Sequence, residues 1–257
     1  MDELKYPLVS IIMPAYNSQY TIKDTIQSVL KQTYPNWELL ITDDLSSDST
    51  PKIIKKFAAQ DPRIKLYSNP VNSGAAVSRN NSLKNANGEF IAFLDSDDLW
   101  EASKLEKQIL WMLKNPNITF SFTAYQLIDE HGNKLKKIID FQGDNVSFGY
   151  HDMLFKKATL GCSTVILKKD AFDDIKMPLI RTGQDYALWL KLLKSCERCY
   201  LYNDVLTQYR VMPNSISRNK IKKAKRQWEI YRKIEGLPLV YSVICFISYG
   251  WRAIFRR

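Results

Sequence analysis

The chain has 257 residues, 45% of them hydrophobic and 12% aromatic, which is enough to bury a substantial core and excludes a disordered protein. Four cysteines at this length exclude a disulfide framework, and residues 1–7 lack the basic and apolar segments of a secretory signal, which predicts a cytoplasmic protein. The formal net charge is +10, but residues 218–257 hold eleven Lys or Arg and two Asp or Glu, so the remainder is nearly neutral.

The first part of the chain alternates between strand-like and helix-like segments. Strands are predicted at residues 8–13, 37–42, 64–67 and 90–94, where apolar runs end in turn residues. Helices are predicted between them: after Thr21 and Asp24, which match a capping box, at Pro51, and after Gly74. This order predicts an α/β fold with a mostly parallel sheet and helices on both faces.

Polar residues follow three of these strands, where sheets of this kind bind ligands. The three segments are Pro14-Ala15-Tyr16-Asn17, Asp43-Asp44 and Asp95-Ser96-Asp97-Asp98. The carboxylates of the third segment repel one another, and a divalent cation such as Mg²⁺ or Mn²⁺ would relieve that repulsion. A solvated acidic turn explains the third segment equally well when it is taken alone. Because all three loops should meet at one cleft, we expect a metal-assisted phosphate site.

The pattern becomes less regular after Trp100. The remaining predicted elements are a helix capped by Ser103 and Glu106, a strand at 118–124, a hairpin turn at 131–133 and a strand at 161–167. An apolar helix follows Gly183, and the spacing makes Asp185 an N-terminal cap.

Two common nucleotide-binding signatures are absent from the sequence. There is no Gly-x-x-x-x-Gly-Lys-Ser/Thr, and no Gly-x-Gly-x-x-Gly follows the first strand. Three reactions remain as alternatives, namely phosphoryl transfer, nucleotide hydrolysis and glycosyl transfer from a nucleotide sugar. Each needs groups that bind a diphosphate. Asp185 is a candidate for the general base.

Five ordered motifs are far more specific together than any one alone. They are residues 9–17, Asp43-Asp44 with Ser46 and Asp48, Asn72-x-Gly74 with Arg79-Asn80, residues 93–100, and Gln184-Asp185-Tyr-x-Leu-Trp189. This combination resembles the family 2 glycosyltransferases with the GT-A fold, and within them the bacterial enzymes that build teichuronic acid, capsule or O-antigen. The resemblance implies a GT-A domain at 1–217, with a nucleotide-sugar half at 1–98 and an acceptor half at 99–217.

The resemblance also implies a role for each matching position. Residues of the nucleotide-sugar site would be Pro14, Ala15, Tyr16, Asn17, Asp43, Asp44, Arg79, Asp95 and Ser96. Mn²⁺ or Mg²⁺ would bind Asp95 and Asp97 with support from Asp98, and Asp185 would be the base of an inverting displacement. The acceptor side would include Trp100, Gly183 and Gln184.

The implied donor is a nucleotide-diphosphate sugar, above all a UDP-sugar, and the implied acceptor is a saccharide, free or linked to undecaprenyl diphosphate. The Gln-x-x-Arg-Trp signature of processive synthases is absent, which favours transfer of one sugar per encounter. The competing hypothesis is a nucleotide-binding protein of the same fold that lacks transferase activity, or a nucleotide-sugar hydrolase.

Three positions depart from the family pattern. Leu45 follows the paired acids where glycine is usual, so this turn should adopt a conformation that a β-carbon tolerates. Gln184 replaces a frequent Glu before Asp185, and Met212 stands where His is frequent, which puts a metal or phosphate contact from position 212 in doubt.

Residues 218–257 form a basic and apolar tail. The run at 239–251 is shorter than the ~20 residues needed to span a bilayer, so we expect an amphipathic helix in the membrane interface. This predicts peripheral association with the inner face of the cytoplasmic membrane. The alternative is a helix packed on the domain. Nucleic-acid binding is disfavoured, because the rest of the chain is nearly neutral and carries no such signature.

Overall fold

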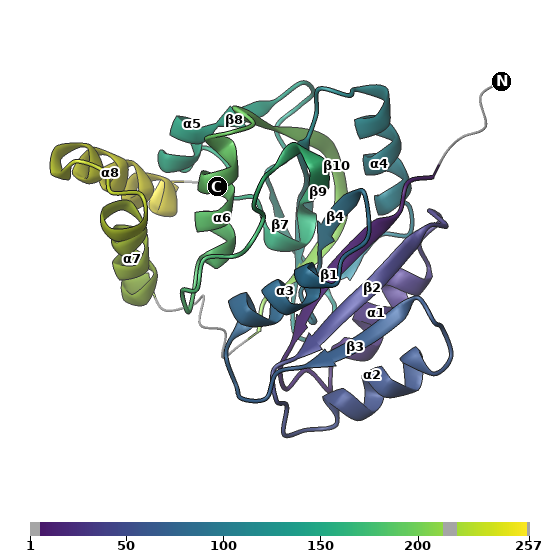
Figure 1. Cartoon of the computed structure of the whole chain (residues 1–257). Helices are drawn as coiled ribbons and strands as arrows, with labels where there is room; N and C mark the ends of the chain where they lie inside the picture. The colour runs from purple at the N-terminus through teal and green to yellow at the C-terminus, as the bar shows by residue number, and fades with distance from the viewer. Residues whose placement is uncertain (1–5, 213–219, 256–257) are drawn as a thin grey trace.

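The computed structural model describes residues 6–212 and 220–255 of the chain. Its centre is a ten-stranded sheet with the order β3-β2-β1-β4-β9-β6-β10-β5, to which β7 adds beside β6 and β8 beside β10. Helices cover both faces of this sheet (Figure 1).

The amino-terminal half is parallel, as predicted. Its elements are β1 (Val9–Ala15), α1 (Ile22–Leu30), β2 (Trp37–Asp43), α2 (Thr50–Ala58), β3 (Ile64–Ser68), α3 (Ala75–Lys84) and β4 (Phe90–Phe93). Strand β1 lies between β2 and β4, with Val9 in register with both Trp37 and Phe90. The carboxyl ends of these strands therefore meet at one edge of the sheet.

The second half of the sheet is mixed. It contains β5 (Leu99–Trp100), α4 (Lys104–Lys114), β6 (Phe120–Ile128), β7 (Lys134–Ile139), β8 (Ser147–Gly149), α5 (Tyr150–Leu154), β9 (Ile166–Lys168), α6 (Gln184–Leu193) and β10 (Arg198–Arg210). Strand β9 runs antiparallel to both β4 and β6, whereas β10 runs parallel to β6. The predicted hairpin joins β6 to β7, but the strand predicted at 161–167 is mostly a 3₁₀ turn, Cys162–Thr164, followed by β9.

Alternation along the strands builds two apolar layers. Ile12 of β1 packs on one face, in a cluster that includes Phe93 and Trp189. Its neighbours Ile11 and Met13 pack on the other, in a cluster formed with helices α1, α2 and α4. Because successive residues of a strand point to opposite faces, a continuous apolar run is what a sheet covered on both sides requires.

Thr21 and Ser103 occupy the N-cap positions of α1 and α4 as predicted, but the expected capping hydrogen bonds do not form. The N-cap of α6 is Gly183 in the left-handed region (φ 74°), not Asp185. The Thr21 hydroxyl instead donates to the Ser96 carbonyl at 3.0 Å, which ties the start of α1 to the acidic loop after β4.

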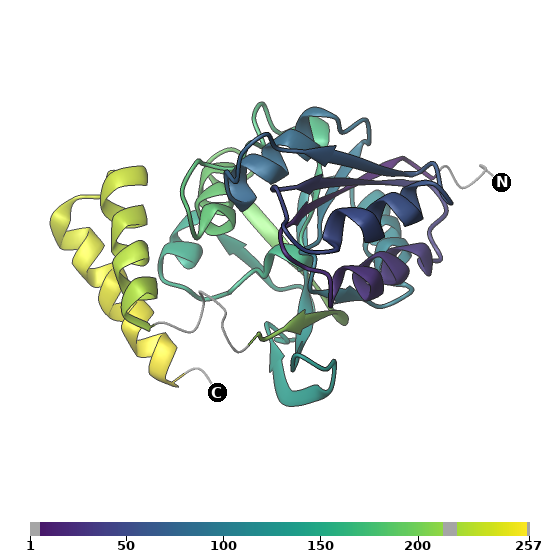
Figure 2. The same ribbon diagram turned by 90° about the horizontal axis from the view of Figure 1, so that it is seen from below.

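The carboxyl-terminal tail folds as two helices beside α5 and α6 (Figures 1 and 2). Helix α7 (Lys220–Glu229) continues through a π-helical turn (Ile230–Ile234) and is followed by α8 (Leu239–Phe255). Four tail residues belong to the main core, namely Ile230, Tyr231, Leu237 and Cys245. The tail therefore packs on the domain, as the alternative hypothesis held.

The other side of α8 is apolar and exposed. Its exposed residues are Leu239, Val240, Val243, Ile244, Ile247 and Trp251, which recur at helical spacing. Within the described ranges, no helix is both long enough and apolar enough to cross a membrane.

Candidate active site

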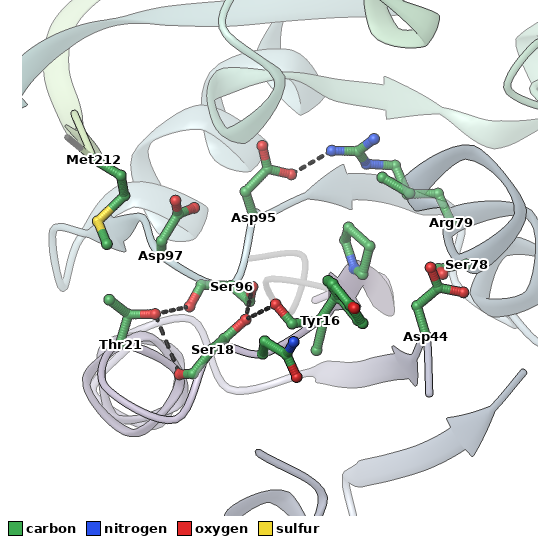
Figure 3. Close-up of a pocket in the computed structure, with 14 residues that line it drawn as sticks. Tyr16, Ser18, Thr21, Asp44, Ser78, Arg79, Asp95, Ser96, Asp97 and Met212 are labelled. Carbon is green, nitrogen blue, oxygen red and sulfur yellow. Dashed lines mark hydrogen bonds and ion pairs between the residues drawn. The ribbon is translucent and has the colours of Figure 1, made fainter. Parts of the chain in front are cut away.

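A cavity of about 450 Å³ opens at the carboxyl ends of β1, β2 and β4, a volume within the usual range for small-molecule sites. Its lining residues are Pro14, Ala15, Tyr16, Asn17, Ser18, Thr21, Asp44, Ala75, Ser78, Arg79, Asp95, Ser96, Asp97 and Met212. The three loops expected to converge therefore line one cavity (Figure 3).

Arg79 on α3 is the cationic wall of this cavity. Its side chain is 5% exposed, and its Nη2 atom donates to the Asp95 carboxylate. Its Nε and Nη1 atoms are buried and have no hydrogen-bond partner in the part of the chain that the structure describes. Burial opposes the charge, but the carboxylates of Asp95 and Asp185 help to raise the pKa of the guanidinium. Leaving buried donors unpaired costs free energy, so this arrangement suits an anionic ligand such as a phosphate.

Asp97 and Asp95 form the acidic wall. Burial and the neighbouring charge of Asp95 raise the pKa of Asp97 to about 6. A hard cation between two such oxygen ligands would offset both effects, so the pair fits Mn²⁺ or Mg²⁺. No cluster of three or more potential metal ligands occurs among the described residues. A cation held here would therefore complete its coordination with phosphate oxygens and water.

Asp98 holds the acidic loop in place through hydrogen bonds to other segments of the protein. It is 1% exposed, accepts from the Arg210 backbone N–H at 2.9 Å and from the Ser163 hydroxyl at 2.5 Å. The same Ser163 oxygen accepts from the Asp95 backbone N–H at 3.0 Å. Asp98 does not line the cavity. The described contacts of Asp98 therefore support the acidic loop, and its predicted part in metal binding stays a prediction.

Asp44 organises the loop opposite Arg79. Its carboxylate accepts from the backbone N–H groups of Ser73 (2.9 Å) and Gly74 (2.7 Å) and from the Asn69 amide (2.7 Å). The Asn72 amide also donates to the Asp44 carbonyl at 3.1 Å, so these bonds join the Asn72-x-Gly74 segment to the paired acids, and Gly74 has the positive φ (87°) that glycine tolerates. Asp43 lies behind this loop, accepts from the Ser46 N–H at 3.0 Å and does not line the cavity.

Leu45 differs from expectation. Its φ is +62°, so this residue adopts the left-handed conformation that the family's usual glycine would adopt freely. A β-carbon costs roughly 1–2 kcal/mol there. The hydrogen bonds that Asp43 accepts from the Ser46 N–H and Asp44 accepts from the Gly74 N–H hold the turn in this conformation.

The predicted acceptor-side residues are not all exposed to a ligand. Trp100 is 4% exposed, and its Nε1 donates to the Ser163 carbonyl at 2.8 Å, so the described contacts of Trp100 are with the protein and its acceptor-side role stays a prediction. Gln184 is also buried. Gly183 faces α7, where an added β-carbon would lie 2.9 Å from Arg226 Cδ.

Asp185 is the second residue of α6 and is partly exposed. Its carboxylate has no hydrogen bond or ion pair within the described residues. It does not line the cavity, but it lies close enough to act electrostatically on Arg79 and Cys162. An unpaired carboxylate beside the cavity keeps its oxygens available to accept a proton.

Sequence reasoning missed several lining residues. Ser18 and Ser96 share a hydrogen bond of 2.7 Å between their hydroxyls, which joins the first loop to the acidic loop. Met212 lies beside Asp97 at the end of β10 (Figure 3). Small polar residues next to the recognised motifs were the available signal for Ser18 and Thr21, whereas the placement of Met212 depends on the tertiary fold.

A buried arginine and paired carboxylates at the carboxyl ends of parallel strands fit the class of enzymes that handle nucleotide diphosphates. The family model described as "Glycosyl transferase family 2" matches residues 10–175. The chain therefore belongs to glycosyltransferase family 2, and it is a glycosyltransferase.

Two curated relatives are similar along nearly their whole length. One is the "Putative teichuronic acid biosynthesis glycosyltransferase TuaG" of Bacillus subtilis, 44% identical over 251 residues, covering 98% of each chain. Another is the "UDP-Glc:alpha-D-GlcNAc-diphosphoundecaprenol beta-1,3-glucosyltransferase WfgD" of Escherichia coli, 43% identical over 249 residues, covering 95% of this chain and 93% of that one.

Solved structures confirm the GT-A fold. S. aureus TarS 1–349 in complex with UDP-GlcNAc aligns with a TM-score of 0.74 at 21% identity, over 93% of this chain and 70% of that one. The mannosyltransferase PcManGT from Pyrobaculum calidifontis, in complex with GDP-Man and Mn²⁺, aligns with a TM-score of 0.70 at 18% identity, over 98% and 71%.

Proposed function

We propose that this protein is an inverting, metal-dependent and non-processive glycosyltransferase of bacterial surface polysaccharide synthesis. It would move one hexosyl residue from a UDP-sugar to a saccharide carried on a lipid diphosphate. The observation that carries this proposal is that Arg79, whose Nε and Nη1 atoms are buried and have no partner among the described residues, lines the same cavity as the crowded carboxylates of Asp95 and Asp97.

The donor would lie along the three loops. Its diphosphate would bind Arg79, while its nucleoside would lie toward Pro14, Tyr16 and Asp44. Asp95 and Asp97 would hold Mn²⁺ or Mg²⁺, which when bound neutralises charge on the departing diphosphate. The Mn²⁺ in the PcManGT complex supports this assignment by analogy of fold.

Asp185 would act as the general base. In a single displacement, the acceptor hydroxyl oxygen attacks the anomeric carbon, its proton passes to the Asp185 carboxylate, and the bond to the nucleoside diphosphate breaks. The configuration at that carbon inverts. The free carboxylate of Asp185 and its electrostatic proximity to Arg79 support this role.

The names of the relatives support the acceptor assignment. WfgD is named for transfer to a sugar on diphosphoundecaprenol, and TuaG for teichuronic acid biosynthesis. A lipid-linked acceptor requires the enzyme to work at a membrane surface. The exposed apolar side of α8, together with the basic residues of the tail, would support peripheral binding there.

A panel of nucleotide sugars, with and without Mn²⁺ and a diphosphate-linked acceptor, tests this proposal. We expect release of free nucleoside diphosphate and glycosylated acceptor only when metal, donor and acceptor are all present. Equal release without acceptor would favour the hydrolase, and donor binding without any turnover would favour a nucleotide-binding protein.

A further inference from the structure

Two cations on α7 are partly shielded from solvent. Lys223 and Arg226 lie one turn apart and are partly buried, whereas Lys222 and Lys225 on the same helix are exposed. In both views α7 stands beside the half of the domain that carries α6 (Figures 1 and 2).

Arg226 packs directly on the segment that leads to Asp185. A β-carbon at Gly183 would lie 2.9 Å from Arg226 Cδ, 3.1 Å from its Nε and 3.2 Å from Ile230 Cδ1. With its φ of 74°, Gly183 is therefore restricted both by backbone conformation and by the space that Arg226 fills. The side chain of Arg226 thus packs on Gly183, which stands two residues before the proposed base, Asp185.

Neither cation has a carboxylate partner among the described residues. Other cations of the same region do: Lys194 pairs with Glu235 at 2.7 Å, and Lys191 pairs with Asp174 at 2.6 Å. Burial and the neighbouring Arg226 charge lower the pKa of Lys223. Like charges three residues apart on a helix destabilise it, so an anion bound between them would relieve an unfavourable contact.

We propose that Lys223 and Arg226 bind the diphosphate of a lipid-linked acceptor, a site separate from the donor diphosphate at Arg79. This inference rests on the proposed function, because it assigns the acceptor of the same reaction. Two adjacent cations match the charge of a diphosphate, and a guanidinium can bind its oxygens with two parallel hydrogen bonds. Because Arg226 packs on Gly183, a diphosphate held here would place the attached sugar near the start of α6, where Asp185 lies, and the exposed apolar residues of α8, in the same two-helix tail, would be available for the lipid.

The test compares the double variant Lys223→Ala/Arg226→Ala with the matched control Lys225→Ala. The acceptors are N-acetylglucosaminyl diphosphoryl undecanol and octyl N-acetylglucosaminide, which lacks phosphate. We expect the double variant to raise the KM for the first compound at least about tenfold. The KM for the second and the Kd for UDP should not change, and Lys225→Ala should match wild type throughout. Equal losses with both acceptors, or no loss, would overturn the inference.

Direct binding separates this inference from the proposed reaction. Calorimetry with the diphosphoryl compound and no donor measures the acceptor site whether or not transfer occurs. Binding that is lost in the double variant would support the site even in a protein without transferase activity. Absence of binding to wild type, or binding that the double variant retains, would contradict it while leaving transfer to be judged from product formation.

Discussion

Arg79 reaches the Asp95 carboxylate with one terminal nitrogen and keeps its remaining donors buried and unpaired. One side chain therefore partly neutralises the acidic loop and also retains donors for an anion. Because Arg79 is on α3 and Asp95 follows β4, the ion pair also fixes the helix against the loop.

Arg79→Lys should separate charge from geometry at the donor site. Lysine keeps the positive charge but loses the planar fork, so we expect the Kd for UDP to rise at least about tenfold. Uridine has no phosphate, and its Kd should stay within about twofold of wild type. Calorimetry measures both, with the exposed Arg63→Lys as control. A similar loss for UDP and uridine would show that the pocket as a whole had collapsed.

Metal binding should depend on the protonation of Asp97. Because its pKa is raised to about 6, protons compete with the cation as the pH falls below that value. We expect the apparent affinity for Mn²⁺ to fall about tenfold per pH unit below 6. Titration of Mn²⁺ between pH 5 and 8 checks this. Asp97→Asn should bind Mn²⁺ weakly at every pH, and an affinity that does not vary in wild type would remove Asp97 as a ligand.

The same raised pKa predicts how stability changes in metal-free protein. A carboxyl group with a folded pKa above its unfolded value of about 3.9 stabilises the fold at low pH and loses that contribution as the pH rises through about 6. Asp97→Asn should therefore raise the free energy of unfolding at pH 7.5 but not at pH 4. Urea unfolding in the presence of a chelator measures this free energy at both pH values. A stabilisation seen only at pH 4 would contradict a raised pKa for Asp97.

Asp185→Asn should abolish transfer and spare donor binding. The carboxylate has no described partner, so the amide replaces it without breaking a contact of the fold. Loss of a general base lowers kcat by about 10²–10⁴-fold, and the Kd for UDP should remain unchanged. Steady-state kinetics and calorimetry give the two values. Normal turnover in this variant would exclude Asp185 from the chemistry.

Leu45→Gly should stabilise the protein. Glycine removes the left-handed strain at φ +62° but adds freedom to the unfolded chain, which leaves a net gain of about 0.5–1 kcal/mol in the free energy of unfolding. The control is Leu113→Gly, at an exposed position of α4, which should lower the free energy of unfolding by about 1 kcal/mol. Urea denaturation measures both, and equal destabilisation would mean that leucine is unstrained there.

Membrane binding through α8 is tested with Val240→Gln/Ile247→Gln. Both residues are exposed, at 73% and 66%, so the double variant should fold normally and lose at least about tenfold in affinity for anionic phosphatidylglycerol vesicles. Sedimentation measures it, with exposed Leu135→Gln as control. Point variants are preferable to deletion of 218–257, because Ile230 and Tyr231 belong to the core. Unchanged sedimentation would reject this surface.

The amino-terminal half was predictable because each strand and helix there is a local pattern. Apolar runs of strand length alternate there with segments of helical periodicity, and one common topology, a parallel sheet covered by helices, accommodates this order. In that topology the carboxyl ends of the parallel strands lie at one edge of the sheet. The convergence of Tyr16, Asp44 and Asp97 on one cavity follows from that topology.

The second half was less predictable because its contacts join distant segments. Asp98 and Trp100 lie in or beside the acidic motif in sequence, yet both form hydrogen bonds with Ser163. Ser163 belongs to the 3₁₀ turn Cys162–Thr164, where the sequence pattern predicts a strand. The predicted capping hydrogen bond of Thr21 does not form for a similar reason, because the Thr21 hydroxyl donates to the Ser96 carbonyl in a distant loop.

Arg210 extends the influence of the acidic loop beyond the cavity. Its guanidinium donates to the Asp97 carbonyl at 2.8 Å and to the carbonyls of Asp129 (3.2 Å) and Glu130 (3.0 Å), at the turn between β6 and β7. That turn is on the surface and can change length or sequence without entering the core. A change in the position of that turn would move the carbonyls that Arg210 contacts and, through this one side chain, would act on the backbone of the acidic loop at Asp97.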